Sequence, residues 1–454
     1  MSLESSPTRS EGEAGGNKTE ANDKNYAIIR KTMGQDERMS IDLRVRLIRQ
    51  INVAFTPGAP IDSKDLFAGR MAQVQKVLNV VFQKGTHAVL FGERGVGKTS
   101  LTNIIFDFLV FSGMSTYYRA RTNCNETGTF DEIWRFLLRQ FTFEQPDGTT
   151  ITLDMVLPEH GPILPENIRE ALQLVTYPTL VIIDELDGIT DRGTRKAIAD
   201  TIKTLSDNAI DTTVLLVGVA ESVDQLIGEH PSIERALREV PMPRMSKNEL
   251  LEIIDKGVDK CEGLHIEDDP RGRIADYSQG LPYYTHLLAR EAAINAIQSD
   301  RFEITKEDLQ AAIREAVDSH LGTNLTLYNK ATTAARGIYF KPVLLACALA
   351  PKDEKGFFYA KDVVDPLRIL TRKSIAIEQF AQHLRDFSTT RGPILERDGR
   401  RYRFIKPMME PYVTLRGLAD GLINDSQLSR PSALSTEPEQ LFLLSDVPAP
   451  PLKI

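Results

Sequence analysis

The stretch HAVLFGERGVGKTSLTNIIFDFLV, residues 87–110, decides the fold of this chain. It opens with an apolar run, Ala88–Phe91, that predicts a buried strand, and it closes with apolar residues at helical spacing from Leu101 to Leu109. Between these runs stands G-x-x-x-x-G-K-T, a glycine-rich loop whose backbone N–H groups can point at phosphate oxygens. The helix behind the loop adds the positive end of its dipole. The stretch therefore predicts a phosphate-binding loop in an α/β fold.

The loop itself predicts a nucleotide and Mg²⁺ as ligands. Lys98 can reach the outer phosphates, and the Thr99 hydroxyl is placed to ligate Mg²⁺. A chance glycine-rich turn is the alternative, but its four fixed positions would match in only about one in fifty to a hundred chains of this length. We expect nucleotide contacts from Gly92, Glu93, Arg94, Gly95, Val96, Gly97, Lys98, Thr99 and Ser100.

A second apolar run, Leu180–Ile183, ends in two acidic residues. We expect Asp184 to hold Mg²⁺ together with Thr99, and Glu185 to deprotonate the water that attacks the γ-phosphate. Two acids that merely end a strand are the alternative, and they would be preferred if the run stood alone. Paired with the loop, the run favours hydrolysis, with Glu185 and Lys98 as catalytic residues.

Other classes of phosphate-loop protein find little support in the sequence. A GTPase needs an N-K-x-D base reader, but Asn329-Lys330 is followed by Ala331-Thr332. The LSGGQ signature of ABC transporters is absent from the chain. A small-molecule kinase would seldom need the acidic pair and two further domains. ATP is therefore the expected nucleotide, and the expected reaction is its hydrolysis.

Composition bounds the class of protein. The 454 residues, 41% hydrophobic and 26% charged, fit a globular protein of two to four domains. The net charge of −8 argues against nucleic-acid binding over the whole surface but permits a local basic patch. Cys124, Cys261 and Cys347 lie far apart without metal-ligand spacing, and no apolar run approaches the length of a membrane span. We expect a cytoplasmic protein without membrane contact.

We expect five consecutive segments along the chain. They are a disordered N-terminal segment (1–40), an ATPase core (41–245), a helical lid (246–320), a C-terminal domain (325–422) and a flexible tail (423–454).

The start of the core is open to two interpretations. An amphipathic helix would place Ile41, Val45 and Ile48 on one face, with Leu47 and Ile51 beside it. The alternation of apolar residues from 41 to 47 would also suit a short strand.

Further motifs give the chain a family resemblance. The segment Phe67–Arg70, the phosphate loop, the run IIDELD (182–187) and Gly280-Leu281-Pro282 together resemble AAA+ P-loop ATPases of the origin-recognition (initiator) type and the related STAND switch ATPases. The resemblance covers roughly residues 41–317. It implies a parallel-sheet ATPase domain, an all-helical lid and a C-terminal winged helix-turn-helix domain.

The same resemblance implies further contacts with the nucleotide. Phe67, Gly69 and Arg70 would lie near the adenine, and Pro282 of the lid would touch the nucleotide. The segment Phe67–Arg70 could alternatively be just the start of a helix. Two positions depart from the initiator pattern, because Glu221 or Ser222 stands where a sensor Asn or Thr is usual and Tyr283 stands where a sensor Arg is usual. These departures favour slow turnover.

The segment 231–238 lies where this family places an arginine finger. Arg235 is our first choice and Arg238 the second, and either would act on the site of a neighbouring copy in a homo-oligomer. A solvated helix face with an Arg235–Glu239 pair at i,i+4 is the alternative.

We expect the C-terminal domain to bind the partner on which the ATPase acts. Two helical stretches precede Pro393–Ile405, a predicted hairpin with Asp-Gly at its turn. Residues 361–420 hold twelve Lys and Arg against eight Asp and Glu, a local +4. Duplex DNA is the expected partner, through phosphate contacts of Arg397, Arg400, Arg401 and Arg403. The alternative is a switch in which this domain binds an unidentified protein partner instead.

Overall fold

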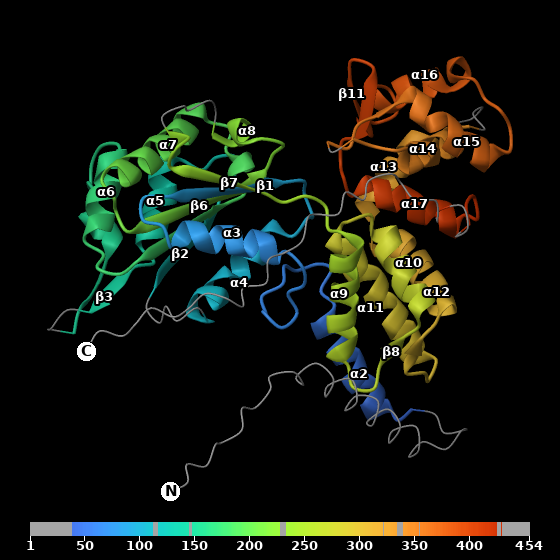
Figure 1. Ribbon diagram of the computed structural model, residues 1–454, viewed down its shortest axis with the longest axis horizontal. Helices are drawn as coiled ribbons and strands as arrows, with labels where there is room; N and C mark the ends of the chain where they lie inside the picture. The colour runs from blue at the N-terminus through green and yellow to red at the C-terminus, as the bar shows by residue number, and fades with distance from the viewer. Residues whose placement is uncertain are drawn as a thin grey trace, which may run out of the picture.

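The computed structural model shows three regions: a sheet domain, a helical lid and a C-terminal domain (Figure 1). It describes residues 39–111, 117–144, 148–227, 233–320, 322–333, 339–353, 355–424 and 428. The segments expected to be disordered or flexible, 1–40 and 423–454, lie almost entirely outside the described residues.

A five-stranded parallel sheet forms the first region, in the order β2-β5-β6-β1-β7. The predicted α/β class is therefore confirmed. Because all five strands run the same way, their carboxyl ends meet at one edge of the sheet. The bounds are β1 His87–Gly92, β2 Tyr118–Asn123, β5 Thr179–Asp184, β6 Thr212–Val219 and β7 Leu237–Pro241.

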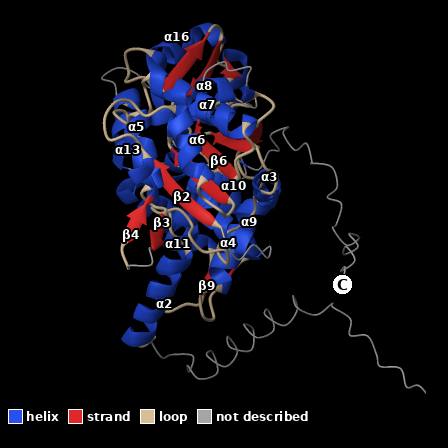
Figure 2. Cartoon of the chain, turned by 90° about the vertical axis from the view of Figure 1, so that its left-hand side faces the viewer, coloured by secondary structure: helices blue, strands red, loops and turns tan. Residues whose placement is uncertain are grey.

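Helices cover both faces of this sheet because its strands are apolar on both sides. Leu90 and Ile182 pack toward α3 and α4, whereas Val89 and Val181 pack toward α5, α6 and α7. The bounds are α3 Met71–Val81, α4 Lys98–Phe111, α5 Phe130–Leu138, α6 Pro165–Gln173, α7 Arg192–Asp207 and α8 Val223–Ile227. Two short antiparallel strands, β3 Thr142–Glu144 and β4 Thr150–Thr152, and two 3₁₀ turns, η1 Leu153–Val156 and η2 Leu186–Gly188, complete the region (Figure 2).

The lid consists of α9 Lys247–Asp259, α10 Asp268–Ser278, α11 Pro282–Gln298 and α12 Lys306–Glu315. It is not helical throughout, because β8 His265–Ile266 and β9 Glu303–Ile304 form a small parallel pair between the helices. Ser246 and Glu249 make a capping box at the start of α9.

Residues 41–54 form a helix, α2 Ile41–Ala54, so the strand alternative is wrong. The predicted apolar face is also wrong, since Ile41 is 79% exposed and Val45 is 62% exposed. The helix instead buries Leu47 and Ile51, and it packs against α9 and α11 of the lid rather than on the sheet (Figure 1).

The C-terminal domain joins helices to a three-stranded antiparallel sheet of order β10-β12-β11. The predicted hairpin is confirmed, but its two-residue turn is Gly399-Arg400, because Asp398 already pairs with Arg401. The bounds are η4 Ala316–His320, α13 Gly322–Thr332, α14 Phe340–Leu349, β10 Phe358–Tyr359, η5 Ala360–Val363, α15 Val364–Thr371, α16 Ile377–Ser388, β11 Leu395–Asp398, β12 Arg401–Phe404 and α17 Met409–Ala419.

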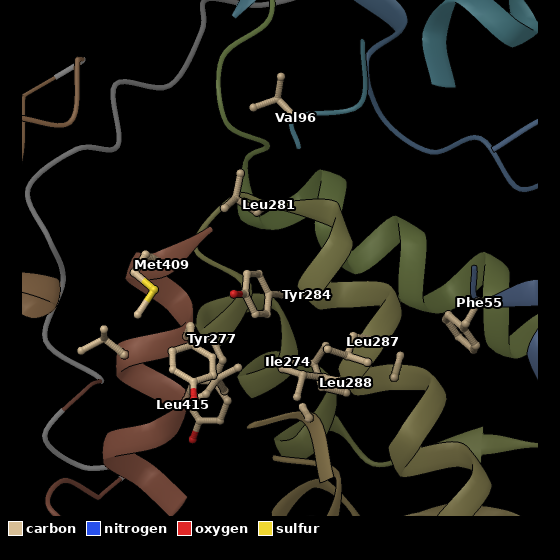
Figure 3. Packing of buried hydrophobic residues seen from close by; sticks show 14 of the residues in the cluster. Phe55, Val96, Ile274, Tyr277, Leu281, Tyr284, Leu287, Leu288, Met409 and Leu415 are labelled. Carbon is tan, nitrogen blue, oxygen red and sulfur yellow. The ribbon is translucent and has the colours of Figure 1, made fainter. Parts of the chain in front are cut away.

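Helix α17 ties this domain to the lid. Met409 and Leu415 of α17 face Tyr284 and Tyr277 of the lid within one buried apolar cluster (Figure 3). The hydroxyl of Tyr284 also donates a hydrogen bond to the carbonyl of Met408.

Among the helices in the part of the chain that the structure describes, none combines the length and apolar character of a membrane span.

Candidate nucleotide site

The phosphate loop connects β1 to α4 at the carboxyl edge of the sheet. Gly92 has φ +154°, and a Cβ at this position would lie 2.3 Å from the carbonyl oxygen of Met242. Gly95 and Gly97 follow with φ of +89° and +94°. Positive φ at alternate positions turns backbone N–H groups to the inside of the loop, and only glycine adopts these angles without strain.

Lys98 lies inside the loop that precedes it. Its Nζ donates to the carbonyl oxygens of Gly92, at 3.0 Å, and Glu93, at 2.7 Å. Burial lowers the pKa of Lys98 to about 8, although Asp187 and Asp184 partly oppose this effect. The ammonium group is thus held where a bound polyphosphate would meet it.

Thr99 and Asp184 meet as the sequence predicts. The Thr99 hydroxyl lies 3.3 Å from Oδ2 of Asp184, although 85 residues separate them in the chain. A hydroxyl and a carboxylate are the hard oxygen ligands that Mg²⁺ prefers, so this donor set fits the metal. Asp184 is only 2% exposed, and its Oδ1 accepts a hydrogen bond from the backbone N–H of Glu185 at 2.8 Å.

Glu185 stands exposed directly after β5. Its backbone is left-handed, with φ +57° and ψ +37°, a rare conformation for a residue with a side chain. Two residues later, Oδ1 of Asp187 accepts from the N–H of Val219 at 2.7 Å and so ties the ends of β5 and β6 together.

Arg121, on β2, is a site residue that sequence reasoning missed. Its Nη2 lies 2.6 Å from Oδ2 of Asp184, and its Nη1 donates to Oδ1 of Asn103 on α4. The run YRARTN has no apolar alternation of its own, so β2 was not predicted and nothing pointed to Arg121.

The segment Phe67–Arg70 lies between the loop and the lid. The Arg70 guanidinium donates to the carbonyls of Val96, at 3.3 Å, and Pro243. The backbone N–H groups of Gly69 and Arg70 donate to Glu252 and Glu249 of α9. Arg70, only 2% exposed, therefore braces the loop from behind, and its expected contact with adenine stays a prediction.

Two further expected nucleotide contacts lie beside the loop. Ser100 uses its Oγ to accept a hydrogen bond from the N–H of Ile61 at 3.1 Å. Pro282 is the first residue of α11 in the lid, and the preceding Gly280 packs against Arg244 and Met245. The structure leaves the nucleotide contacts of both residues as predictions.

Comparison with known families agrees with this geometry. Residues 83–227 match the family model of the AAA domain, and they contain the loop, Asp184 and Glu185. Residues 83–227 form an AAA domain. No curated protein sequence matches the chain.

Several solved structures are similar to this chain. The Orc1 protein of Aeropyrum pernix in complex with DNA is 15% identical, with 81% of this chain and 96% of that chain covered and a TM-score of 0.45. A Walker-type ATPase of Pyrococcus abyssi is 15% identical, with 79% and 99% covered and a TM-score of 0.48. RuvB of Thermotoga maritima is 14% identical, with 76% and 95% covered and a TM-score of 0.40. Likenesses this distant carry no functional argument.

A chain of charges links the AAA domain to the C-terminal domain. Arg244, just after β7, donates from Nε to Glu93 of the loop at 2.8 Å and pairs through Nη2 with Glu410 of α17 at 3.0 Å. Glu410 also pairs with Lys352 at 2.8 Å. Burial alone would raise the pKa of Glu410, but Lys352 and Arg244 together lower it. Sequence reasoning missed this network because its members lie far apart in the chain.

The C-terminal domain also touches the loop directly. A Cβ built on Gly95 would lie 3.0 Å from Sδ of Met408, and one built on Gly356 would lie 3.8 Å from Oε1 of Glu93. The loop of the AAA domain is therefore partly covered by residues that follow the lid in sequence.

The side chain of Glu221, at the expected sensor position, contacts the C-terminal hairpin. Arg403 of β12 donates from Nη1 to Oε1 of Glu221, and its Nε lies 2.7 Å from Oε2 of Glu396. Lys355 lies 4.0 Å from the other oxygen of Glu221.

The remaining hairpin arginines differ in their contacts. Arg401 pairs with Asp398 at 2.5 Å, and Arg397 donates to the carbonyl of Gly399 at 3.0 Å. Arg400, at the turn, is exposed. Among the four candidates for DNA contact, acidic partners therefore already hold Arg401 and Arg403.

The alternative for this segment, a solvated helix face with an Arg235–Glu239 pair, is wrong. Leu237–Pro241 forms β7, an edge strand beside β1, and Arg238 lies on it. Arg235 is exposed just before this strand. Since Leu237 pairs with His87 at the start of β1, both arginines lie at the end of the sheet opposite the loop.

His286 does not face the loop. It is buried on α11, its ring makes an edge contact with Phe55 at 6.1 Å, and burial lowers its pKa to about 4. We therefore interpret His286 as a structural residue of the lid.

Proposed function

We propose that the protein binds ATP with Mg²⁺, hydrolyses it slowly, and works as a nucleotide-dependent switch. The observation that carries this proposal is the meeting of Lys98, Thr99 and Asp184 at one edge of the sheet. Slow turnover fits Tyr283 at the lid position where a sensor arginine is usual.

The chemistry follows from these side chains. Bound Mg²⁺ supplies charge neutralisation at the outer phosphates, and Thr99 and Asp184 would hold it. Lys98 binds the phosphates once its ammonium exchanges the carbonyls of Gly92 and Glu93 for phosphate oxygens. Glu185, exposed at the strand end, orients a water and accepts its proton during attack on the γ-phosphate.

The switch rests on the contacts over the loop. Met408 lies against Gly95, and Arg244 joins Glu93 of the loop to Glu410 of α17. A nucleotide that displaces Glu93 or Met408 must therefore break contacts between the C-terminal domain and the AAA domain. We infer that nucleotide binding and release change how firmly this domain is docked.

We infer duplex DNA as the partner of the undocked C-terminal domain, which we interpret as a winged helix. In the docked arrangement Arg403 is neutralised by Glu221 and Glu396. Release from Glu221 would remove one of these two acids, and so increase the positive charge available for phosphate contact next to Arg400. A switch that binds a protein partner is the second candidate, and the pairing of Arg401 and Arg403 with acids favours it.

We further infer a homo-oligomer. Arg235 and Arg238 lie toward the end of β7 opposite the loop of their own chain, about 10 Å or more from the loop end of the strand at about 3.3 Å per residue. An arginine so placed points away from the loop of its own chain, which favours action on the γ-phosphate of a neighbouring copy.

Calorimetry of ATP binding with and without Mg²⁺, together with single-turnover hydrolysis, tests the proposal. We expect Mg²⁺-dependent binding, and hydrolysis that Glu185→Gln slows strongly. Binding that is indifferent to Mg²⁺, or no binding at all, would refute the proposed function. Fluorescence anisotropy with duplex DNA across a salt series separates the two candidate partners.

A further inference from the structure

Asp184 contacts a cationic side chain, Arg121, in addition to Thr99. Its Oδ2 receives Nη2 of Arg121 at 2.6 Å and the Thr99 hydroxyl at 3.3 Å. The Asp184 side chain is 3% exposed and that of Arg121 27%, so water screens this ion pair little.

The Arg121 guanidinium is held in place from two elements. On β2, Thr122 and Asn123 pair with Ile183 and Asp184 of β5, which brings Arg121 within reach of the strand end. On α4, Oδ1 of Asn103 accepts from Nη1 of Arg121.

Asn103 is itself anchored. Its Nδ2 donates to the carbonyl of Ile61 at 3.2 Å, and the N–H of Ile61 donates to Ser100 at the start of the same helix. Arg121 is therefore placed by a connected set of hydrogen bonds rather than by a flexible side chain finding an acid.

This placement conflicts with full metal access. Oδ2 is the oxygen of Asp184 that faces Thr99, the other residue of the metal-binding pair. A guanidinium and a divalent cation on one carboxylate oxygen repel each other, and the repulsion is large because the site is buried.

We propose that Arg121 is a positioning residue that competes with Mg²⁺ for Oδ2 of Asp184 and so raises the Mg²⁺ concentration needed for nucleotide binding. The inference rests on the proposed ATP site and adds a control on its metal requirement. Nucleotide alone would then bind weakly, and full occupancy would require Mg²⁺ to displace the guanidinium.

The test uses the full chain and a fluorescent ADP analogue, titrated with Mg²⁺ at fixed nucleotide. Arg121→Gln keeps a hydrogen-bonding side chain but removes the charge. We expect it to lower the Mg²⁺ midpoint about tenfold, the order expected for removing one charge near a divalent ion. Arg121→Lys, which keeps the charge, should shift the midpoint less. Mn²⁺ bound with ADP, followed by electron paramagnetic resonance, gives a second readout without hydrolysis.

Arg119 offers a matched control. It lies on the same strand and the same side as Arg121, but its guanidinium stacks over Phe106, 5.2 Å from the ring centre, rather than on Asp184. Arg119→Gln should leave the Mg²⁺ midpoint within about twofold.

The outcomes separate the inference from the proposed function. An unchanged or higher Mg²⁺ midpoint in Arg121→Gln, with normal binding by the parent, overturns the inference alone. Absence of nucleotide binding by the parent at saturating Mg²⁺ refutes both. If Arg121→Gln does not fold, Asn103→Ala loosens the guanidinium and should shift the midpoint in the same direction, and no shift would overturn the inference.

Discussion

Glu410 of α17 forms a 3.0 Å ion pair with Arg244, the residue that also binds Glu93 in the phosphate loop. The pair joins the C-terminal domain to the nucleotide site through a single guanidinium. A change of charge or position at the loop is therefore felt by the ion pairs at the domain interface.

Glu410→Gln should destabilise the protein. The substitution leaves Arg244 and Lys352 facing each other without the carboxylate, in a site where the Glu410 side chain is 8% exposed. We expect a loss of about 3 kcal/mol in the free energy of unfolding of the docked C-terminal domain, as for other broken buried pairs. Denaturant unfolding measures it.

Asp365→Asn is the matched control for Glu410→Gln. Asp365 pairs with Arg368 on an exposed helix face, with its side chain 73% exposed. Its replacement should change stability by less than about 0.5 kcal/mol. Equal effects of the two substitutions would contradict the view that the buried ion pairs of Glu410 stabilise the protein.

ATP affinity should fall as the pH rises above 8. Lys98 has a pKa of about 8 before ligand binding, so the ammonium is largely charged at pH 7 and largely neutral at pH 9. Binding of a polyphosphate favours the charged form, and affinity should drop by about tenfold between these pH values. Calorimetry at pH 7, 8 and 9 measures the trend.

Lys98→Ala provides the control for the pH effect. We expect it to weaken ATP binding at least about tenfold at pH 7, a loss of about 1.4 kcal/mol or more, and to remove most of the pH dependence. A pH profile that survives in this variant would assign the titration to another group.

Glu185→Gln should bind ATP normally and hydrolyse it very slowly. The amide cannot accept the proton of the attacking water, whereas Asp184 and Thr99 are untouched. Single-turnover assays with radiolabelled ATP compare the rates. Matching rates for variant and parent would exclude Glu185 as the base.

Arg235→Ala should retain ATP binding but lose hydrolysis, if the finger acts between copies. Mixing it with Glu185→Gln should restore part of the activity, since each copy supplies what the other lacks. Arg238→Ala, three residues along, is the comparison. No recovery in mixtures, with assembly intact, would argue against a finger supplied in trans.

Glu221→Gln should strengthen binding to duplex DNA, because it loosens Arg403 from the AAA domain. Replacing Arg400 and Arg401 together with Ala should weaken binding to all duplexes alike and flatten the slope of log K against log salt by up to about two. Fluorescence anisotropy measures both effects. If duplex binding is unchanged in all of these variants, the hypothesis that the C-terminal domain binds a protein partner would be favoured over DNA binding.

Local patterns made the centre of the site predictable. The loop, Asp184 and Glu185 each follow a strongly apolar strand, so their sequence neighbours reveal both the strand and the turn. The C-terminal hairpin was predictable for the same reason, although its turn lies one residue later, at Gly399-Arg400.

Residues brought in from distant or weakly patterned segments could not be predicted. Leu237–Pro241 is a five-residue edge strand with two exposed charged residues, and the spacing of Arg235 and Glu239 imitates a helix pair. Glu410 gains its role through Lys352 and through Arg244, which lies 166 positions earlier in the sequence, and no local pattern connects these residues.

Glu185 holds a left-handed backbone, a geometry that glycine and asparagine adopt more readily than glutamate. The strand end thus keeps a residue that local conformational preference alone would not choose, at a cost of about 1 kcal/mol. Laboratory evolution for heat tolerance would therefore tend to replace Glu185 by Gly or Asn. Under the proposed function, such variants would be more stable but would bind ATP without hydrolysing it.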